Sequence, residues 1–534
     1  MSGKSLSIEI TDEQMEAFLK RVEGHCLIEG DFILIKAMAE SIRRIRYVLE
    51  EKDTTIGRLV RVIFGAKTES SRNILKGSDK EAQCSSSILG PPDSSKKEPK
   101  GKKKGHGRNG ANNYPGAEKK KISHPQFSPG TLCPGCLKGK LYNTKPGVFI
   151  RFVGTAPIQG TVYELEKYRC NLCGEIFAAK SPEQAGDKKY DETVGSTIAL
   201  LKYGSGLPFY RLEKLQENYG IPLPASTQWE IAQRTGGEIY PAYHALIDEA
   251  AQGDIFHNDD TPAKILCMLR NNEQDEDDPN RKGLFTTGVI SVSGNKKIAL
   301  FFTGRKHAGE NLEDLLRKRK AELAPPIQMS DALSRNLPKG FTTILANCMG
   351  HARRNFIDVL SNFPEQCHHV IEILAKVYHH DEITKENNMN PEERLKFHQE
   401  RSRALMEELK EWLNSQLEDK KVEPNSSIGK AINYMLKHWE PLTLFLRVPK
   451  APLDNNIVER ALKIVILHRK NSLFFKTKNG AYIGDLFMSL IHTCSLSGVN
   501  PFDYLTTLQR HSSEVFKNPK RWLPWNYHLA VSEP

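Results

Sequence analysis

The order of apolar runs and turns between residues 255 and 302 constrains the fold of this chain more than any other feature. Ile255 to Asp259 has the pattern of a strand that ends in an acidic residue. Two further runs rich in β-forming residues follow, at Leu284 to Val292 and Lys297 to Phe302. Ser293-Gly294-Asn295, which separates these two runs, is typical of a hairpin turn. The sequence therefore predicts three strands in an antiparallel meander.

The segments after this meander predict strands that alternate with helices. Ala308 to Leu323 is expected to form a helix, and Ile327 to Ser330 a short strand that delivers Asp331. Thr342 to Ala346 is expected to be a fifth strand. Three antiparallel strands followed by strands alternating with helices are the order of the ribonuclease-H-like fold. We therefore predict an α/β, ribonuclease-H-like core over residues 253–475.

Helical segments are expected before, within and after this core. Residues 190–252 have apolar spacing that suits a helix-turn-helix-like DNA reader or a scaffold, with the scaffold as the default interpretation. The sequence at about 352–450 has a strongly helical pattern, as in Ala404-Leu-Met-Glu-Glu-Leu-Lys-Glu-Trp-Leu413. It predicts an all-α insertion. Residues 480–520 predict a C-terminal helical segment.

A seven-residue apolar repeat marks residues 30–66. One series is Ile35, Ile42, Leu49, Ile56 and Ile63, and the second is Met38, Ile45 and Leu59, which Lys52 interrupts. Such a heptad seam favours a coiled coil that joins protomers, so we expect a homodimer or higher oligomer. An amphipathic helix packed on its own chain is the alternative interpretation.

The charge balance of the chain favours a polyanionic partner. The 534 residues carry a formal net charge of +11 and a sequence pI of about 9.0. Residues 70–126 are rich in Ser, Pro, Gly and Lys and predict a flexible basic linker, whose lysines either hold DNA phosphates or remain solvated. The N-terminus lacks the apolar stretch of a signal peptide, so we expect a cytoplasmic protein, associated with the nucleoid when on DNA.

Two Cys-x-x-Cys pairs lie between residues 127 and 182. They are Cys133-Pro-Gly-Cys136 and Cys170-Asn-Leu-Cys173. A two-residue spacer lets both sulfurs reach one ion, so the four thiolates predict a structural zinc module with no open position for chemistry. Free thiols or a redox pair are the alternatives. The chain has ten cysteines in all, which is sparse for a disulfide framework and indicates a reducing compartment.

A helix with one acidic position follows Pro452. The segment from Asp454 to Leu462 has a capping residue in Asp454 and an apolar face that includes Val458, whereas Glu459 lies on the polar stripe. Phosphoryl transfer requires hard oxygen ligands that hold two divalent ions. Carboxylates at strand ends and on an adjoining helix supply such ligands. A single carboxylate is more often a solvated surface group, so the argument depends on their placement in one fold order.

Three segments closely resemble the insertion-sequence sixty-six family of bacterial DDE transposases. They are His257-Asn-Asp-Asp-Thr-Pro-Ala-Lys-Ile-Leu266, Cys348-Met-Gly-His-Ala-Arg-Arg-Asn-Phe356 and Pro452-Leu-Asp-Asn-Asn-Ile-Val-Glu-Arg-Ala-Leu462. The order of coiled coil, Lys-rich linker, four-cysteine module, core and C-terminal piece is also similar. The resemblance therefore spans nearly the whole chain.

The resemblance implies a catalytic triad of Asp259, Asp331 and Glu459 that binds Mg²⁺ or Mn²⁺, with Asp260 as the competing first aspartate. The chain departs from the family pattern after the second aspartate, in Ala332-Leu-Ser-Arg-Asn336, and at Met349-Gly350. Cys348 and His351 resemble a motif of several DDE transposases, for which packing, DNA contact and catalysis remain open; we do not interpret the pair as a zinc site.

The activity that the resemblance implies is cleavage at the ends of an insertion sequence, followed by transfer of the freed 3′-hydroxyl into target DNA. The basic residues beside the glutamate, Arg460, Lys463, Arg469 and Lys470, are candidates for phosphate contacts or form a solvated face. Small accessory proteins are possible partners. Two alternatives remain: a ribonuclease-H-like nuclease that does not join DNA, and an inactive DNA-binding relic.

Overall fold

The computed structural model describes residues 12–24, 128–131, 155–169, 176–180, 188–270 and 281–532, with a few isolated positions before residue 188. The chain forms two compact units, one of residues 1–82 and 160–534 and the other of residues 83–159. The linker at 70–126 lies outside the described residues, as do the four cysteines of the predicted zinc module. The coiled coil at 30–66 lies outside them apart from isolated positions, so these three predictions stay predictions.

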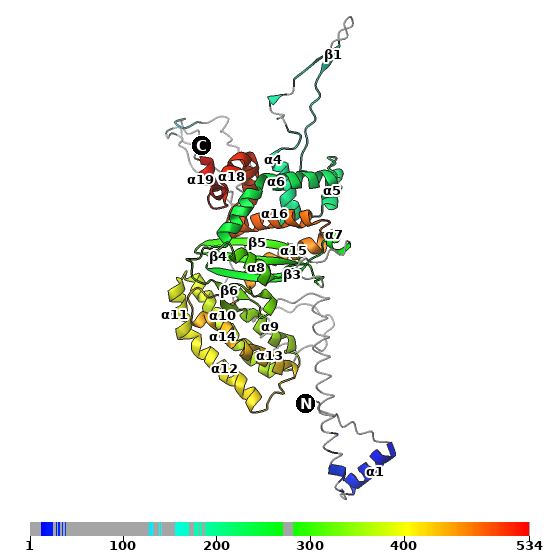
Figure 1. Ribbon diagram of the computed structural model, residues 1–534, viewed down its shortest axis with the longest axis vertical. Coiled ribbons are helices and arrows are strands. Elements are labelled where there is room, and N and C mark those ends of the chain that lie inside the picture. The colour runs from blue at the N-terminus through cyan, green and yellow to red at the C-terminus, as the bar shows by residue number, and fades with distance from the viewer. Residues whose placement is uncertain are drawn as a thin grey trace. The chain divides into compact units, whose positions relative to one another are not determined.

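A mixed five-stranded sheet lies at the centre of the larger unit (Figure 1). Its strands are β3 (Ile255–Pro262), β4 (Phe285–Ser293), β5 (Lys296–Gly304), β6 (Ile327–Ser330) and β7 (Ile344–Asn347). The strand order is β5-β4-β3-β6-β7. β3, β4 and β5 pair antiparallel, whereas β6 is parallel to both β3 and β7. The predicted meander and the two later strands are confirmed, and the fold is mixed α/β.

Local sequence explains where these elements begin and end. The β4–β5 hairpin turns at Gly294-Asn295, where Gly294 has φ +55°, a conformation that glycine adopts without strain. The helix expected over 308–323 is shorter: α8 is Ala308–Leu316. Beyond it, the Arg319 guanidinium donates to the carbonyl oxygens of Ala251 and Gly253, which lie 68 and 66 residues earlier and which no local pattern reveals.

Two helices cover opposite faces of the β3–β4 pair. α15 (Asn456–Ser472) packs where Gly288 of β4 lacks a side chain, and α8 contacts the same two strands. The hydroxyl of Thr287, on the other face of β4, accepts from Asn311 of α8 at 2.8 Å. Because successive strand residues point to opposite faces, Gly288 and Thr287 separate the two helices.

The edge strand β5 is covered by α16 (Lys478–Leu496). Three α16 side chains spaced four residues apart accept from the outward backbone N–H groups of β5. Asp485 accepts from Thr303 at 2.7 Å, Ser489 from Phe301 at 3.0 Å and Thr493 from Ala299 at 3.0 Å. The helix thereby satisfies an edge that would otherwise be open to pairing with another chain.

The remaining helices form two groups (Figure 1). On the β5 side are α4 (Glu192–Ala199), the π-helix η4 (Leu200–Gly204), α5 (Phe209–Asn218), α6 (Ala225–Ala250), α16, α17 (Pro501–Arg510), α18 (Ser512–Lys517), the 3₁₀ helix η7 (Pro519–Trp522) and α19 (Tyr527–Ser532). On the β6 side are α9 (Met349–Val359), α10 (Pro364–Glu386), α11 (Pro391–Arg401), α12 (Arg403–Glu418), α13 (Ser427–Lys437), α14 (Trp439–Leu442) and the 3₁₀ helix η6 (Leu444–Leu446).

The second group lies between β7 and α15 in the sequence, where helices were expected. It shares one apolar core with the sheet, in which Phe356, Leu374 and Leu413 are fully buried together with Met329 of β6 and Ala346 of β7. Burial of these side chains fixes the helices against the β6–β7 end of the sheet.

Four short elements complete the description. They are α1 (Asp12–Glu23), the antiparallel pair β1 (Lys167–Arg169) and β2 (Ile176–Ala178), and α7 (Leu266–Arg270). None of the helices within the described residues combines the length and the apolar character that crossing a membrane requires.

Candidate functional site

The first predicted carboxylate, Asp259, lies on β3 and faces α15. Its partner across the β3–β4 ladder is Gly288. A Cβ atom at Gly288 would lie 2.9 Å from Leu462 Cδ2 and 3.2 Å from Val458 Cγ2, so only glycine lets α15 approach the sheet this closely. Paired residues share a face, so the side chain of Asp259 points toward the helix that carries Glu459.

Asp260, the competing candidate, points to the other face and is occupied by structural contacts. Its Oδ1 accepts from the Thr287 hydroxyl at 2.7 Å. Its Oδ2 accepts from the backbone N–H of Ala308 at 3.0 Å and lies 3.0 Å from His307 Nδ1. Ala308 begins α8, so this carboxylate satisfies the positive end of a helix. The Asp260 side chain is 1% exposed, and it lies apart from the face that Asp259 shares with α15.

Glu459 lies in the first turn of α15, and Asn455 holds that turn against β3. The capping residue predicted from the sequence was Asp454, whereas the structure places the cap at Asn455. The Asn455 carbonyl oxygen accepts from the Glu459 backbone N–H at 3.2 Å. The Asn455 side chain does not cap the helix and donates instead to the Asn258 carbonyl oxygen of β3 at 3.2 Å. The Asp454 carboxylate accepts from the backbone N–H of Asn456 at 3.1 Å.

Asp331 follows directly after β6, as predicted. Its Oδ1 accepts from the side-chain amide of Asn336 and from the backbone N–H of Leu333, the latter at 3.3 Å. Asn336 ends the short 3₁₀ helix η5 (Ser334–Asn336). The stretch that departs from the family pattern thus supplies the side chain that fixes this carboxylate.

His351 and Arg354 of α9 approach Glu459. His351 Nδ1 lies 3.7 Å from Glu459 Oε1, and Arg354 lies 3.7 Å from Oε2. Cys348, His351 and Glu459 each offer a ligand atom within 4.8 Å of the others. Cys348 Sγ accepts from the backbone N–H of Asn455 at 3.2 Å, and burial raises the pKa of this thiol to about 12. Cys348 is therefore a neutral packing group, whereas His351 belongs to the surroundings of Glu459.

The surroundings of Asp259, which include the charges of the other two predicted carboxylates, change its pKa. Burial above all, together with the charges of Asp331, Glu459 and Asp260, raises the pKa of Asp259 to about 7, although the Asp260 N–H opposes this by donating to Oδ1 at 2.8 Å. The site therefore concentrates negative charge in a partly buried place. Carboxylate oxygens are the donors that Mg²⁺ and Mn²⁺ prefer, so the chemistry of Asp259, Asp331 and Glu459 suits a divalent ion. Among the described residues, the group whose ligand atoms lie within 4.8 Å of one another is Cys348, His351 and Glu459.

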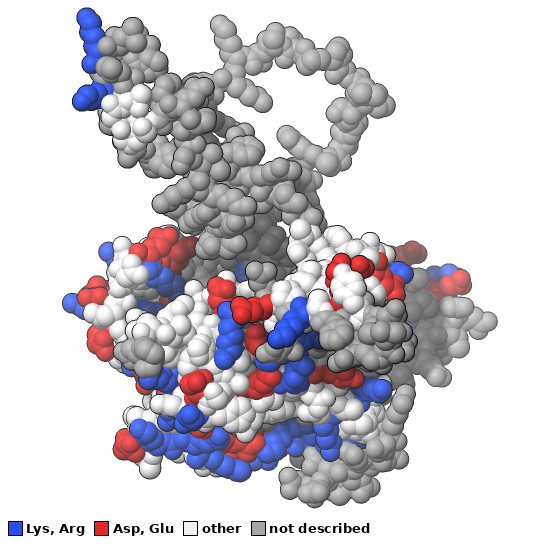
Figure 2. Space-filling model, turned by 90° about the horizontal axis from the view of Figure 1, so that it is seen from above, with Lys and Arg blue, Asp and Glu red and all other residues white. Residues whose placement is uncertain are grey.

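The four basic candidates on α15 differ in their surroundings. Arg460, Lys463 and Lys470 are exposed and form no ion pair with any residue that the structure describes. Arg469 instead donates to the Thr261 hydroxyl at 2.9 Å and to the Pro262 carbonyl oxygen, so it anchors the end of β3. On the face seen in Figure 2, Lys and Arg side chains gather in a band along the lower edge.

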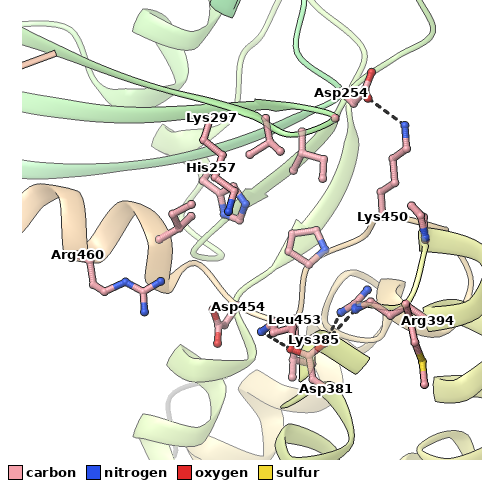
Figure 3. A pocket seen from close by; sticks show the side chains of 17 residues that line it. Asp254, His257, Lys297, Asp381, Lys385, Arg394, Lys450, Leu453, Asp454 and Arg460 are labelled. Carbon is pink, nitrogen blue, oxygen red and sulfur yellow. Dashed lines mark hydrogen bonds and ion pairs between the residues drawn. The ribbon is translucent and has the colours of Figure 1, made fainter. Parts of the chain in front are cut away.

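A cavity of about 430 Å³ lies beside the start of α15 (Figure 3). Five basic and three acidic residues line it. Lys450 is paired with Asp254 at 2.9 Å, and both Lys385 and Arg394 are paired with Asp381. Lys297 and Arg460 also line it and have no ion pair among the described residues, so the cavity retains positive charge.

The described strands on either side of Cys170 and Cys173 bear on the zinc prediction. β1 ends at Arg169 and β2 begins at Ile176, and these two residues are paired in the antiparallel ladder. The two cysteines between these strands lie outside the described residues, so the zinc module stays a prediction.

Sequence reasoning alone did not identify several residues of this site. Gly288, Asn258, Gln328 and Asn336 received no role, yet each contacts the site or its supports. The sequence feature that could have revealed them is the presence of polar residues within the apolar runs predicted as strands, as in Ile255-Phe-His-Asn258 and Ile327-Gln-Met-Ser330. Buried amides of this kind require partners and thus indicate a hydrogen-bond network.

Comparison with known proteins identifies relatives of the chain. A family model described as "Transposase IS66 family" matches residues 188–483. Uncharacterized protein y4jD of Sinorhizobium fredii is 28% identical over 380 residues, which cover 68% of this chain and 71% of the relative. Uncharacterized protein y4hP of the same organism is 26% identical over 380 residues, covering 68% and 67%.

Proposed function

Because the chain belongs to the Transposase IS66 family, we propose that it cleaves DNA at the ends of an insertion sequence and joins them to target DNA, using Asp259, Asp331 and Glu459. The observation that carries this proposal is the raised pKa of Asp259, to which burial contributes most and the charges of Asp331 and Glu459 also contribute. Asp259 lies on β3, Asp331 follows β6 and Glu459 lies on α15, so strand and helix positions would together supply the three carboxylates.

The strand order supports a ribonuclease-H-like core. β5-β4-β3-β6-β7 has an antiparallel meander on one side and parallel strands on the other. Asp259 lies on the central strand β3, and Asp331 follows its parallel neighbour β6, so the two residues lie at the same edge of the sheet. The structural role of Asp260 favours Asp259 as the first catalytic aspartate.

Asp259, Asp331 and Glu459 would hold divalent ions, whose chemistry would be to activate the attacking oxygen and stabilise the leaving oxygen of the phosphodiester. The residues of the chain orient this chemistry. The Asp331 carboxylate is held by Asn336, and Glu459 is held within reach of His351 and Arg354. Arg354 and Arg460 flank Glu459 with positive charge that suits the DNA phosphates.

Further parts of the proposal concern partners. Lys463, Lys470 and the basic cavity residues Lys297 and Arg460 would contact DNA phosphates, with Arg469 in a structural role. The coiled coil would join two protomers and so hold two DNA ends, and Zn²⁺ bound by Cys133, Cys136, Cys170 and Cys173 would stabilise its module. Small accessory proteins would assist transposition.

A cleavage and joining assay tests the proposal. Purified protein, Mg²⁺ and a duplex that carries the terminal repeat of the element are combined, and wild type is compared with Asp259→Asn, Asp331→Asn and Glu459→Gln. We expect wild type to cut and join, while the three variants bind DNA without cutting it. Cutting without joining would indicate the nuclease alternative, and variants as active as wild type would place the site elsewhere. If wild type does not cut, accessory proteins are added before the relic alternative is adopted.

A further inference from the structure

Four neutral amide side chains form a connected, fully buried network beneath the three carboxylates. They are Asn258 on β3, Gln328 on β6, Asn336 at the end of η5 and Asn455 at the start of α15, and each is 0% exposed. Buried amides are retained only where their hydrogen bonds are made, so the contacts of this network indicate its role.

Asn455 connects the helix that carries Glu459 to the strand that carries Asp259. Its Nδ2 donates to the Asn258 carbonyl oxygen at 3.2 Å, and its Oδ1 lies 3.0 Å from His257 Nδ1. An amide oxygen can only accept, so the His257 ring donates to it through Nδ1. Asn258 directly precedes Asp259, and Asn455 lies one helical turn before Glu459, so one amide fixes both carriers.

Asn258 and Gln328 extend the network to the segment after Asp331. Asn258 Nδ2 donates to the Asn336 carbonyl oxygen at 2.8 Å, and Gln328 Nε2 donates to the same oxygen at 2.7 Å. Gln328 Nε2 also donates to Asn258 Oδ1 at 3.1 Å. Asn336 in turn donates to Asp331 Oδ1. The network therefore reaches the carriers of all three carboxylates.

The side-chain oxygen of Asn336 is in a surrounding that lowers the stability of the fold. This oxygen, Oδ1, is buried and has no hydrogen-bond partner among the described residues. Rotating the amide would direct this oxygen at the Asp331 carboxylate and lose the donor. Directing Nδ2 at Asp331 therefore leaves Oδ1 of Asn336 buried without a hydrogen bond, which is unfavourable for folding.

We propose that this amide network holds the backbone segments that carry Asp259, Asp331 and Glu459 in a fixed arrangement, from which their carboxylates bind divalent ions. The inference rests on the proposed function. Neutral donors suit this task better than Lys or Arg, because they fix carboxylates without cancelling the charge that attracts the ion. Amides also do not titrate, so the arrangement does not change with pH. The four amides are positioning residues and do not touch the reacting atoms.

Mn²⁺ binding to the full-length protein, followed by electron paramagnetic resonance of the free ion, tests this role without requiring activity. We expect Asn336→Ala to weaken Mn²⁺ binding by about 10- to 100-fold, the range for loss of a residue that supports a metal ligand. Raising the Mn²⁺ concentration should restore the DNA cleavage rate of this variant, since its carboxylates are intact. Mn²⁺ affinity equal to that of wild type in the folded variant would overturn the inference.

Gln509→Ala provides the matched control. Gln509 is a buried amide on α17, with bonds to Ser196 at 2.9 Å and Thr235 at 3.1 Å, on helices that carry none of the three carboxylates. We expect it to lower thermal stability as Asn336→Ala does and to leave Mn²⁺ affinity unchanged. Equal losses of affinity in both variants would mean general destabilisation and would contradict the positioning role.

Two further variants keep the result decisive. If Asn336→Ala does not fold, Gln328→Met replaces it, since methionine fills a similar volume and removes the amide that holds the Asn336 carbonyl; unchanged Mn²⁺ affinity would then overturn the inference. Asp259→Asn distinguishes a failure of the proposed function from a failure of the network inference. If it binds Mn²⁺ as wild type does, the proposed function fails; if it loses binding and the amide variants do not, only the network inference fails.

Discussion

Oδ2 of Asp260 lies 3.0 Å from Nδ1 of His307, and His307 is the N-cap residue of α8. The same oxygen accepts from the Ala308 backbone N–H, and the second oxygen accepts from Thr287. The neighbouring Asp259 points to the opposite face of β3, toward α15. Two adjacent aspartates thus have different surroundings, and we expect them to respond differently to the same substitution.

Asp260→Asn should lower stability by about 1–3 kcal/mol, because the amide that replaces one oxygen cannot accept from the donors at the start of α8. Asp259→Asn should abolish DNA cleavage without lowering stability. Thermal unfolding, combined with the cleavage rate per folded molecule, distinguishes the two. The reverse pattern, with inactive but stable Asp260→Asn, would make Asp260 the catalytic aspartate.

The pH dependence of stability should report on Asp259. Its pKa of about 7 in the folded protein lies above the ordinary value of 3.8, so the folded state binds this proton more tightly than the unfolded state. The stability contributed by the group is therefore complete below about pH 4 and is lost as the pH rises toward 7.

Asp259→Asn removes this titration, so in EDTA its stability advantage over wild type should grow between pH 5 and pH 8, reaching roughly 1–4 kcal/mol. Unfolding midpoints across that range give the difference. Burial also raises the pKa of Asp485 to about 7, but this residue is present in both proteins and cancels. A stability difference that is constant with pH would contradict the assignment.

Metal binding should depend on pH for the same reason. A proton on Asp259 competes with the ion, so Mn²⁺ affinity should fall by about tenfold per pH unit below the pKa of about 7. Calorimetry at pH 6 and pH 8, in buffers of different ionisation enthalpy, should show proton release at the lower pH. Affinity and proton release that do not change with pH would mean that Asp259 does not bind the ion.

Gly288→Ala tests the close approach of α15 to the sheet. The added Cβ would meet Leu462 and Val458 of α15, which should shift the helix and Glu459 with it. We expect a stability loss of about 1–3 kcal/mol and slower cleavage. Gly304→Ala is the control, because a Cβ at that position meets nothing within 4 Å. Equal activity of the two variants would show that the distance between α15 and the sheet does not matter.

The strands were predictable because each is a short apolar run with turn residues at its ends. Ile255 to Asp259 and Ile327 to Ser330 fall within β3 and β6. Alternation along β3 implied that Asp259 and Asp260 face opposite sides. It could not indicate which side α15 covers, because that depends on the packing of a helix about 200 residues away.

The supports of the site were not predictable for the same reason. Asn258 and Asn336 are 78 residues apart and Asn258 and Asn455 are 197 apart, so their hydrogen bonds follow from the assembled sheet. The cap of α15 was assigned to Asp454 because an acidic residue before a helix usually caps it. In the folded chain Asn455 occupies the cap position, and its side chain instead joins α15 to β3.

Cleavage by Asp259→Cys tests metal binding by the site most directly. A thiolate is a poor ligand for Mg²⁺ and a better one for Mn²⁺. We predict that this variant loses cleavage in Mg²⁺ and regains it in Mn²⁺, whereas wild type cleaves with either ion and Asp259→Ala with neither. Cleavage by Asp259→Cys in Mg²⁺ at the wild-type rate, or no recovery of the folded variant in Mn²⁺, would contradict a role for Asp259 as a ligand of the catalytic ion.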